Sequence, residues 1–183
     1  MNLFNIDISK YQTISFDLFD TLLLRTYSRD TLFNKIDKIL PNFYTLRKQA
    51  EILAYHENKY FTYKQIYKHL PFDSNIEQNI EKNFIYVNQE MLNFYNYCCK
   101  EKNVIITSDM YFSKDFLEPL CNSLGIFNYS KFLVSSDMKM AKYDNTIFDK
   151  YITRRYKDVL HIDDREFNYN KITFIKYEKM CVF

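Results

Sequence analysis

Four segments of the sequence carry charged or hydroxyl side chains of the types that phosphate chemistry uses. Asp17 directly follows the apolar run TISF, Ser108 follows VIIT, and the pair Asp163-Asp164 follows VLHI. Lys142 lies in a polar segment between the last two of these runs. Together they supply a nucleophile-type carboxylate, a hydroxyl donor, a cation and an acidic pair able to hold a metal.

The elements that must position these side chains are short buried strands. Apolar, β-branched runs predict strands over 13–17, 104–106, 132–134, 159–162 and 172–175. Helices are expected between them, over 114–124 and 145–156, and Gly125 stands where a left-handed helix end belongs. This alternation predicts an α/β fold, a Rossmann-like parallel sheet with helices on both faces. Ligands bind beyond the carboxyl ends of such strands, where the polar side chains are expected to meet.

A helical block separates the first of these strands from the rest. Thr62 with Gln65 has the pattern of a capping box, and so has Ser74 with Glu77. The second box is expected to open one long helix that runs toward Cys99, because apolar residues recur behind it at helical spacing.

The expected division of the chain is a core with a helical cap inserted after the first strand. We assign residues 1–25 and 101–183 to the α/β core and residues 26–100 to the cap. A cap in this position would lie over the strand ends, where it could exclude water and select the substrate. A plain helical subdomain without that role remains the alternative.

The composition excludes several classes of protein. Hydrophobic residues make up 47% of the chain and charged residues 26%, so the chain can bury a core and is not expected to be disordered. Its net charge of +2, without a basic stripe, argues against a nucleic-acid binder. No apolar run approaches the length of about 20 residues that a membrane helix needs. We therefore expect neither nucleic acid nor membrane as a partner.

The cysteines and the first residues favour a cytoplasmic protein. Cys98, Cys99, Cys121 and Cys181 form no CxxC motif, and adjacent cysteines make a poor disulfide pair. The opening segment MNLFNIDISK is too short and too polar for a signal peptide. Reduced thiols in the cytoplasm are the expected state.

Four motifs in order resemble those of the haloacid-dehalogenase-like hydrolase superfamily. They are FDLFDTLLLR (16–25), TSDMYFS (107–113), AKYDNTIF (141–148) and HIDDREF (161–167). The second motif is similar to that of a subgroup of predicted hydrolases with SDMY, and RKQAE (47–51) and QIYKHL (65–70) also resemble that subgroup. The resemblance spans about residues 14 to 175, nearly the whole chain.

The resemblance implies a Mg²⁺-dependent phosphatase acting on a small phosphorylated metabolite such as a sugar phosphate. In that family an aspartate like Asp17 attacks phosphorus and forms an aspartyl-phosphate. Asp17, Asp164 and the backbone carbonyl of Phe19 would bind Mg²⁺. Asp163 stands where this motif usually has glycine, and it would contact the metal directly or through water.

The same resemblance implies how the substrate is held. Lys142 would neutralise phosphoryl oxygens and steady the nucleophile, and Ser108, with Thr107 as second choice, would donate a hydrogen bond to a phosphoryl oxygen. Asp109 and Arg25 are further candidates for contact with the substrate. The expected oligomeric state is a monomer or a weak homodimer.

One departure from the family pattern keeps other functions open. Phosphatases of this family usually have a second aspartate two residues after the nucleophile, where this chain has Phe19. Asp20 follows one place later, where glycine is common, and its side chain is expected to point elsewhere. The alternatives are therefore a catalytically idle relative that binds a phosphorylated ligand or a protein partner, and a metal-independent dehalogenase-type hydrolase.

Overall fold

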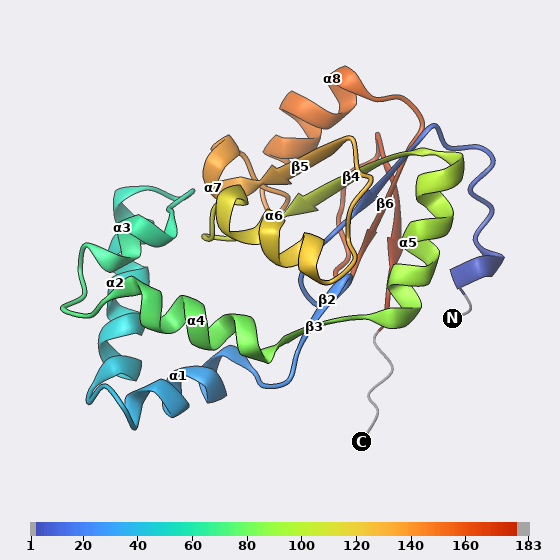
Figure 1. Cartoon of the computed structure of the whole chain (residues 1–183). Helices are drawn as coiled ribbons and strands as arrows, with labels where there is room; N and C mark the ends of the chain where they lie inside the picture. The colour runs from blue at the N-terminus through green and yellow to red at the C-terminus, as the bar shows by residue number, and fades with distance from the viewer. Residues whose placement is uncertain (1–2, 179–183) are drawn as a thin grey trace.

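A five-stranded sheet forms the centre of the larger lobe of the computed structural model, which describes residues 3–178 (Figure 1). The strand order is β5-β4-β1-β6-β7, and every neighbouring pair is parallel. The strands are β1 (Thr13–Phe16), β4 (Asn103–Ser108), β5 (Lys131–Val134), β6 (Val159–Asp163) and β7 (Thr173–Lys176). The predicted α/β class and the five predicted strands are confirmed.

The two faces of the sheet bury different side chains because residues alternate along each strand. On one face, the Phe16 ring lies 5.3 Å from Tyr95 and 6.2 Å from Phe94, both on α5 (Gln89–Glu101). Helix α6 (Lys114–Ser123) joins the same apolar cluster. The opposite face is covered by the π-helical turn η2 (Phe148–Ile152) and α8 (Thr153–Arg155), which occupy the predicted helix 145–156.

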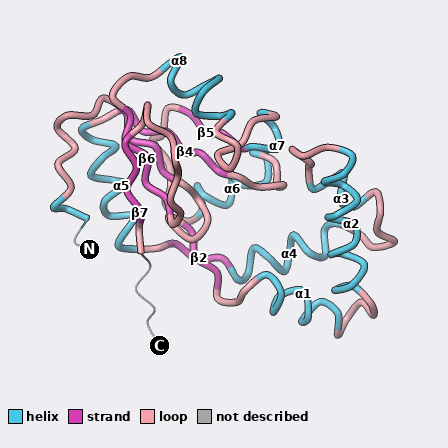
Figure 2. The backbone as a smooth tube through the Cα atoms, turned by 180° about the vertical axis from the view of Figure 1, so that it is seen from behind, coloured by secondary structure: helices cyan, strands magenta, loops and turns pink. Residues whose placement is uncertain are grey.

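The smaller lobe is helical and is joined to the sheet by a two-stranded ribbon. Strand β2 (Leu23–Arg25) leads out to it and pairs antiparallel with β3 (Ile85–Val87), which leads back. Between them lie α1 (Arg29–Asp37), α2 (Phe43–Glu57), α3 (Tyr63–Tyr67) and α4 (Ser74–Phe84) (Figures 1 and 2). Leu32, Phe33, Ile36 and Phe43 form a small core of its own. The predicted capping box of Thr62 and Gln65 is confirmed at α3.

The long helix predicted from Ser74 toward Cys99 is wrong. It is interrupted at Ile85–Val87, because these apolar residues pair with β2, and a new helix, α5, begins at Gln89. The cap of α4 is Asp73, whose side chain accepts a hydrogen bond from the Asn75 amide, and not Ser74. Helix α5, which our division placed in the cap, lies beside the sheet on the side away from the helical lobe (Figure 1). The rest of that division stays a prediction.

Smaller elements complete the part of the chain that the structure describes. They are η1 (Leu3–Asn5) and α7 (Ser135–Met138). Gly125 has φ +83° just after α6, which is the left-handed conformation predicted for it. Cys98, Cys99 and Cys121 are free thiols, whereas Cys181 lies outside the described residues.

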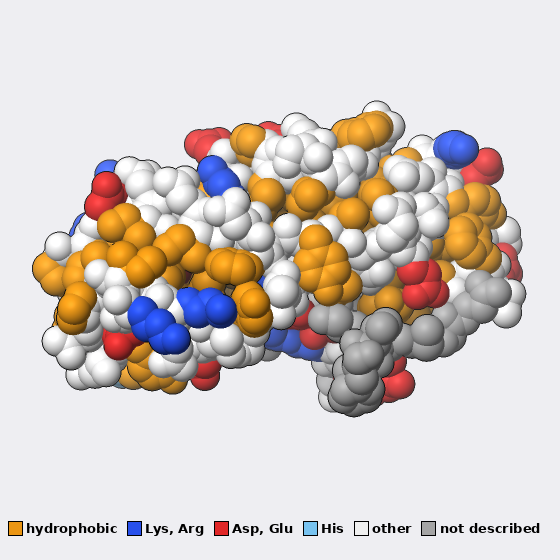
Figure 3. Space-filling model, turned by 60° about the horizontal axis from the view of Figure 1, so that its bottom comes forward, with side chains coloured by type: hydrophobic (Ala, Val, Ile, Leu, Met, Phe, Trp, Pro, Cys, Tyr) orange, Lys and Arg blue, Asp and Glu red, His pale blue; other side chains and the backbone are white. Residues whose placement is uncertain are grey.

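The lengths of the helices and the exposed hydrophobic side chains are relevant to whether the chain contacts a membrane or another protein. Within residues 3–178, no helix is both long enough and apolar enough to cross a membrane. Hydrophobic side chains are exposed on both lobes (Figure 3), among them Ile39 and Ile52 in the helical lobe and Phe127 on the sheet lobe. The oligomeric state, monomer or weak homodimer, stays a prediction.

Candidate active site

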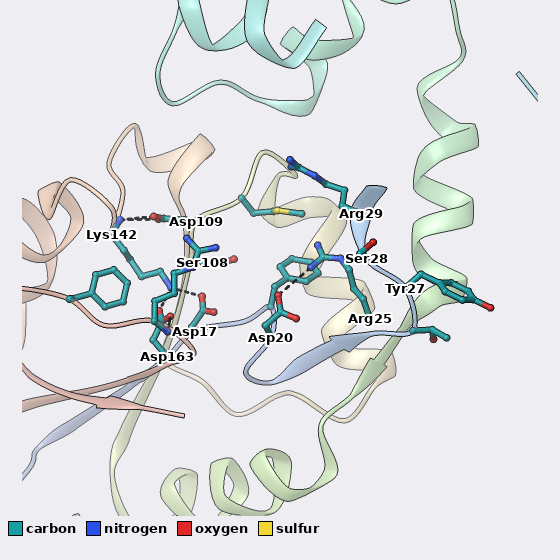
Figure 4. Close-up of a pocket in the computed structure, with 15 residues that line it drawn as sticks. Asp17, Asp20, Arg25, Tyr27, Ser28, Arg29, Ser108, Asp109, Lys142 and Asp163 are labelled. Carbon is teal, nitrogen blue, oxygen red and sulfur yellow. Dashed lines mark hydrogen bonds and ion pairs between the residues drawn. The ribbon is translucent and has the colours of Figure 1, made fainter. Parts of the chain in front are cut away.

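A cavity of about 550 Å³ opens beyond the carboxyl ends of β1, β4 and β6, where it meets the segment that enters the helical lobe. Three groups of residues line it: those at the strand ends, those of the β2–α1 connection, and Lys142 (Figure 4). The residues are Asp17, Phe19, Asp20, Arg25, Thr26, Tyr27, Ser28, Arg29, Ser108, Asp109, Met110, Lys142, Asp163, Arg165 and Phe167. The parallel topology thus brings the predicted residues Asp17, Ser108, Lys142 and Asp163 to one edge of the sheet.

The Lys142 ammonium group lies between two carboxylates in this cavity. It donates hydrogen bonds to Asp17 Oδ1, at the end of β1, and to Asp163 Oδ2, at the end of β6. All three side chains are at least nine-tenths buried. Asp164 adds a third carboxylate, and one oxygen atom from each of the three aspartates lies within 4.8 Å of the others. We call Asp17, Lys142, Asp163 and Asp164 the strand-end cluster.

Asp109 positions the loop that carries Lys142. Its carboxylate accepts hydrogen bonds from the backbone amide of Lys142 at 2.9 and 3.0 Å and from that of Tyr143 at 3.0 Å. Asp109 lines the cavity, as expected of a substrate contact, but these bonds already use both carboxylate oxygens. Its observed contacts therefore hold Lys142 in place.

A chain of hydrogen bonds inside the sheet fixes Asp163 from behind. His161 lies 3.0 Å from Asp163 through Nε2 and 2.8 Å from the Ser15 hydroxyl through Nδ1. Burial lowers the pKa of His161 to about 4, so the ring is neutral near pH 7. A neutral ring that donates from Nε2 accepts the Ser15 hydroxyl at Nδ1. His161 is thus a bonded core residue, as its position in a buried strand suggests.

Thr107 belongs to that internal chain and not to the cavity wall. Its hydroxyl lies 3.0 Å from the Ser15 hydroxyl, and the residue is completely buried. Because neighbouring residues of a strand face opposite sides, Ser108 is the one that lines the cavity. The expectation that Thr107 could reach the substrate is corrected by this alternation.

The carboxylates of the strand-end cluster are in unequal environments. Burial, which is the largest cause, and the nearby Asp163 charge together raise the pKa of Asp17 to about 7 against the lowering effect of Lys142. Burial also raises the pKa of Asp164 to about 6. Burial acts in the same direction on Asp163, but the His161 hydrogen bond and the Lys142 charge outweigh it and lower the pKa. One ammonium group therefore faces more negative charge than it can neutralise.

This surplus of negative charge suits a divalent cation. Carboxylate oxygens are the ligands that Mg²⁺ prefers, and each of the three aspartates brings one oxygen within 4.8 Å of the others. Asp17 and Asp163 line the cavity, whereas Asp164 is not among its lining residues. Asp163 has the most hydrogen-bond partners of the three, because its Oδ1 accepts a hydrogen bond of 2.9 Å from the Arg165 amide while its Oδ2 is bonded to Lys142 and His161. Asp164 is only partly buried and is the freer carboxylate. The donor set of the described residues thus fits a magnesium ion.

The Phe19 ring makes a cation–π contact with the Arg25 side chain at the cavity wall. The Arg25 guanidinium carbon lies 4.0 Å from the centre of the Phe19 ring, and Arg25 Nε donates to Glu81 Oε1 at 2.9 Å. Asp20 has φ +62°, which explains why glycine suits its position. Its carboxylate lines the cavity 3.9 Å from an Arg25 nitrogen. The expectation that Asp20 points elsewhere is therefore wrong.

Two arginines of the cavity wall were missed by sequence reasoning. Arg29 is the first residue of α1, and Arg165 follows the Asp163-Asp164 pair. Both lie in polar segments where an arginine is ordinarily exposed to solvent. The only available signal was that Arg165 lies within the motif HIDDREF and that Arg29 follows the motif FDLFDTLLLR closely.

Comparisons with known proteins bear on the fold. Neither a protein-family model nor a curated protein matches the sequence. Among solved structures, a HAD family enzyme of Bacteroides thetaiotaomicron, BT-2542, is 18% identical with a TM-score of 0.62, over 92% of this chain and 94% of that one. A mutant of the same enzyme in complex with magnesium and inorganic phosphate is 16% identical, with the same TM-score and coverage.

A second group of similar structures consists of dehalogenases. The L-2-haloacid dehalogenase of Xanthobacter autotrophicus is 12% identical with a TM-score of 0.52, over 84% of this chain and 70% of that one. Identities this low carry information about the fold alone. The chain has the haloacid-dehalogenase-like fold.

Proposed function

We propose that this chain is a hydrolase of phosphate monoesters that uses Asp17 as its nucleophile and Mg²⁺ as its cofactor. The observation that carries the proposal is the strand-end cluster, in which a buried carboxylate at the end of β1 contacts Lys142 beside two further aspartates at an open cavity. The substrate in this proposal is a small phosphorylated molecule, such as a sugar phosphate, and the site of action is the cytoplasm.

The residues that would hold the metal belong to the strand-end cluster, in which three carboxylates lie close together. Asp17 and Asp164 would be direct ligands, with the Phe19 carbonyl as a third, while Asp163 would act from its fixed place between Lys142 and His161. When bound, Mg²⁺ would neutralise phosphoryl oxygens and reduce their repulsion of the nucleophile. The similar structure with magnesium and inorganic phosphate supports this assignment.

The proposed reaction has two displacements at phosphorus. A carboxylate oxygen of Asp17 forms a bond to phosphorus while the bond to the ester oxygen breaks, which leaves an aspartyl-phosphate and an alkoxide. Water protonates the alkoxide, since Phe19 has no proton to give. A second water then attacks phosphorus and gives a proton to the hydroxide that the first water left, and phosphate and the Asp17 carboxylate are released. Lys142 neutralises oxygens throughout, and Ser108 donates a hydrogen bond to one of them.

The proposal is tested by turnover of an aryl phosphate with Mg²⁺. Asp17→Asn should lower kcat by about 1,000-fold or more, because it removes the attacking group. Asp115→Asn, which alters an exposed carboxylate on α6, is the matched control and should change little. Unchanged turnover in the Asp17→Asn protein would exclude Asp17 as the nucleophile.

Carbon–halogen hydrolysis through the same aspartate is the second candidate. It is favoured by Phe19, which offers no acid or base, and by the Lys142 contact, which compensates Asp17 without a metal. Turnover of a haloacid that persists in EDTA would select this candidate, whereas phosphatase activity should be lost in EDTA. If phosphate esters raise the melting temperature and are not turned over, the chain is instead a binding protein.

A further inference from the structure

Two of the four cationic side chains in the cavity are already matched by carboxylates. Lys142 is bonded to Asp17 and to Asp163. Arg25 donates to Glu81, a residue that is almost completely buried, at 2.9 Å. Their charges are therefore committed to the protein itself or, for Lys142, to the reacting phosphoryl group.

The other two cations, Arg29 and Arg165, are more exposed to the cavity than Lys142 and Arg25. Arg29 lies 3.1 Å from Glu51, but the same carboxylate also accepts a hydrogen bond of 2.9 Å from Arg47. One carboxylate thus serves two guanidinium groups. The exposed side chain of Arg165 forms no ion pair with any residue from 3 to 178.

Arg29 and Arg165 stand where the active-site cavity meets a second one. Both line the cavity of about 550 Å³, and both line a neighbouring cavity of about 240 Å³ that continues past Lys59 and Tyr60. Arg29 belongs to the helical lobe, and Arg165 to the loop after β6. In Figure 4 Arg29 lies across the cavity from Asp17.

We infer that the substrate carries a second anionic group, a carboxylate or a second phosphate, which binds between Arg29 and Arg165. This inference rests on the proposed phosphatase function, because it assigns the remote end of the substrate in the same site. Guanidinium groups match the planar or tetrahedral oxygens of such anions with paired hydrogen bonds. A substrate with a neutral remote end would leave Arg165 without a partner and Arg29 with only its share of Glu51.

The acids at this junction do not oppose a bound anion strongly. Asp109 also lines both cavities, but its oxygens are held by the amides of Lys142 and Tyr143. Glu51 is bonded to both neighbouring arginines. Lys59, in the second cavity, is already paired with Asp144 at 2.7 Å, so its charge is matched.

Kinetics with matched esters test the inference. The probes are glycerol phosphate, phosphoglycerate and glycerol bisphosphate, which share a phosphate ester and differ in the second group. Phosphoglycerate and glycerol bisphosphate are the doubly anionic esters, meaning that each has a second anionic group besides the phosphate ester. The wild-type protein should prefer one of these two, and its preference identifies the second group as a carboxylate or as a phosphate. In Arg165→Gln and in Arg29→Gln, the ratio of kcat/KM for that ester to kcat/KM for glycerol phosphate should fall about tenfold or more, the value of a charge-assisted hydrogen bond.

Arg154→Gln provides the control, since Arg154 is an exposed arginine at α8, outside both cavities. It should keep the wild-type ratio. Equal kcat/KM for all three esters in the wild-type protein, or a ratio that neither Arg165→Gln nor Arg29→Gln changes, would overturn the inference while leaving the phosphatase proposal intact.

Binding without turnover separates the two proposals. Calorimetric titration of the Asp17→Asn protein with each ester and Mg²⁺ measures affinity independently of catalysis. If the wild-type protein turns over no ester, but a doubly anionic ester binds about tenfold tighter than glycerol phosphate and loses that advantage in Arg165→Gln, the phosphatase proposal fails and the second-anion site stands.

Discussion

Two groups of buried charged side chains, one in each lobe, differ in how their charges balance. The first, the helical-lobe cluster, consists of Arg29, Arg47, Glu51 and Glu77. Arg47 is completely buried and donates to both carboxylate oxygens of Glu77, at 2.8 and 3.1 Å, and to Glu51 at 2.9 Å. Two guanidinium groups there face two carboxylates.

The strand-end cluster has the opposite character. One ammonium group, that of Lys142, contacts Asp17 and Asp163, and Asp164 adds a third carboxylate within 4.8 Å of those two. The strand-end cluster opens to a cavity, whereas in the helical-lobe cluster Arg47 and Glu77 are completely buried and only Arg29 reaches that cavity. A balanced buried cluster stabilises one arrangement of the chain, but an unbalanced one beside a cavity is ready to accept a cation and an anionic ligand.

The largest effect is predicted for a substitution that breaks the balanced helical-lobe cluster. Arg47→Met removes the partner of Glu77 and leaves that buried carboxylate uncompensated, so the free energy of unfolding should fall by about 3–5 kcal/mol. Denaturant unfolding followed by circular dichroism measures it. Lys48→Met, which removes the neighbouring lysine that pairs with Asp30 at the surface, should cost no more than about 1 kcal/mol. Similar losses in the two proteins would contradict a structural role for the helical-lobe cluster.

A smaller effect, stabilisation by Mg²⁺, is predicted for the strand-end cluster and not for the helical-lobe cluster. Mg²⁺ that binds only the folded protein should raise its stability by about 2.7 kcal/mol at roughly 100 times the dissociation constant. Thermal unfolding with and without Mg²⁺ measures this gain. It should shrink strongly in Asp164→Asn and persist in Glu77→Gln, whatever that change does to the baseline stability. A gain that Asp164→Asn leaves intact would place the metal elsewhere.

The smallest predicted effect is a pH dependence in metal-free buffer. The pKa of Asp17 is about 7 in the folded chain against 3.8 for an ordinary aspartate, so the folded state binds the proton more tightly. Stability from this group is therefore complete below about pH 4 and is lost as the pH rises toward about 7. Asp164 acts in the same direction. Asp163, whose pKa is lowered, instead contributes stability near neutral pH, and that contribution is lost only in acid.

Thermal unfolding in EDTA between about pH 5 and pH 8 tests this dependence. The melting temperature of the wild-type protein should fall more steeply than that of Asp17→Asn, by at least roughly 2–4 °C, the shift that each kcal/mol produces in a chain of this length. Parallel curves for the two proteins would show that Lys142 compensates Asp17 fully without a metal.

Much of the strand-end cluster could be predicted from local sequence. The runs before Asp17, Ser108 and Asp163 are apolar and β-branched, and polar residues end each of them, so the strands and their ends are encoded within a few residues. Parallel pairing then brings those ends to one edge. The prediction failed at Ile85–Val87, where local helical periodicity yields to pairing with β2, a partner distant in sequence.

The sequence by itself determined that Asp17 stands at a strand end and that a lysine and two aspartates follow at intervals that suit one site. Only the tertiary structure decided which side chains face the cavity and which are already bonded. It turned Thr107 inward, committed Asp109 to the Lys142 loop, brought Asp20 to the cavity wall and placed Arg29 and Arg165 along the same two cavities. The physical reason is that charge balance and hydrogen bonding depend on contacts between distant segments, which local propensity does not encode.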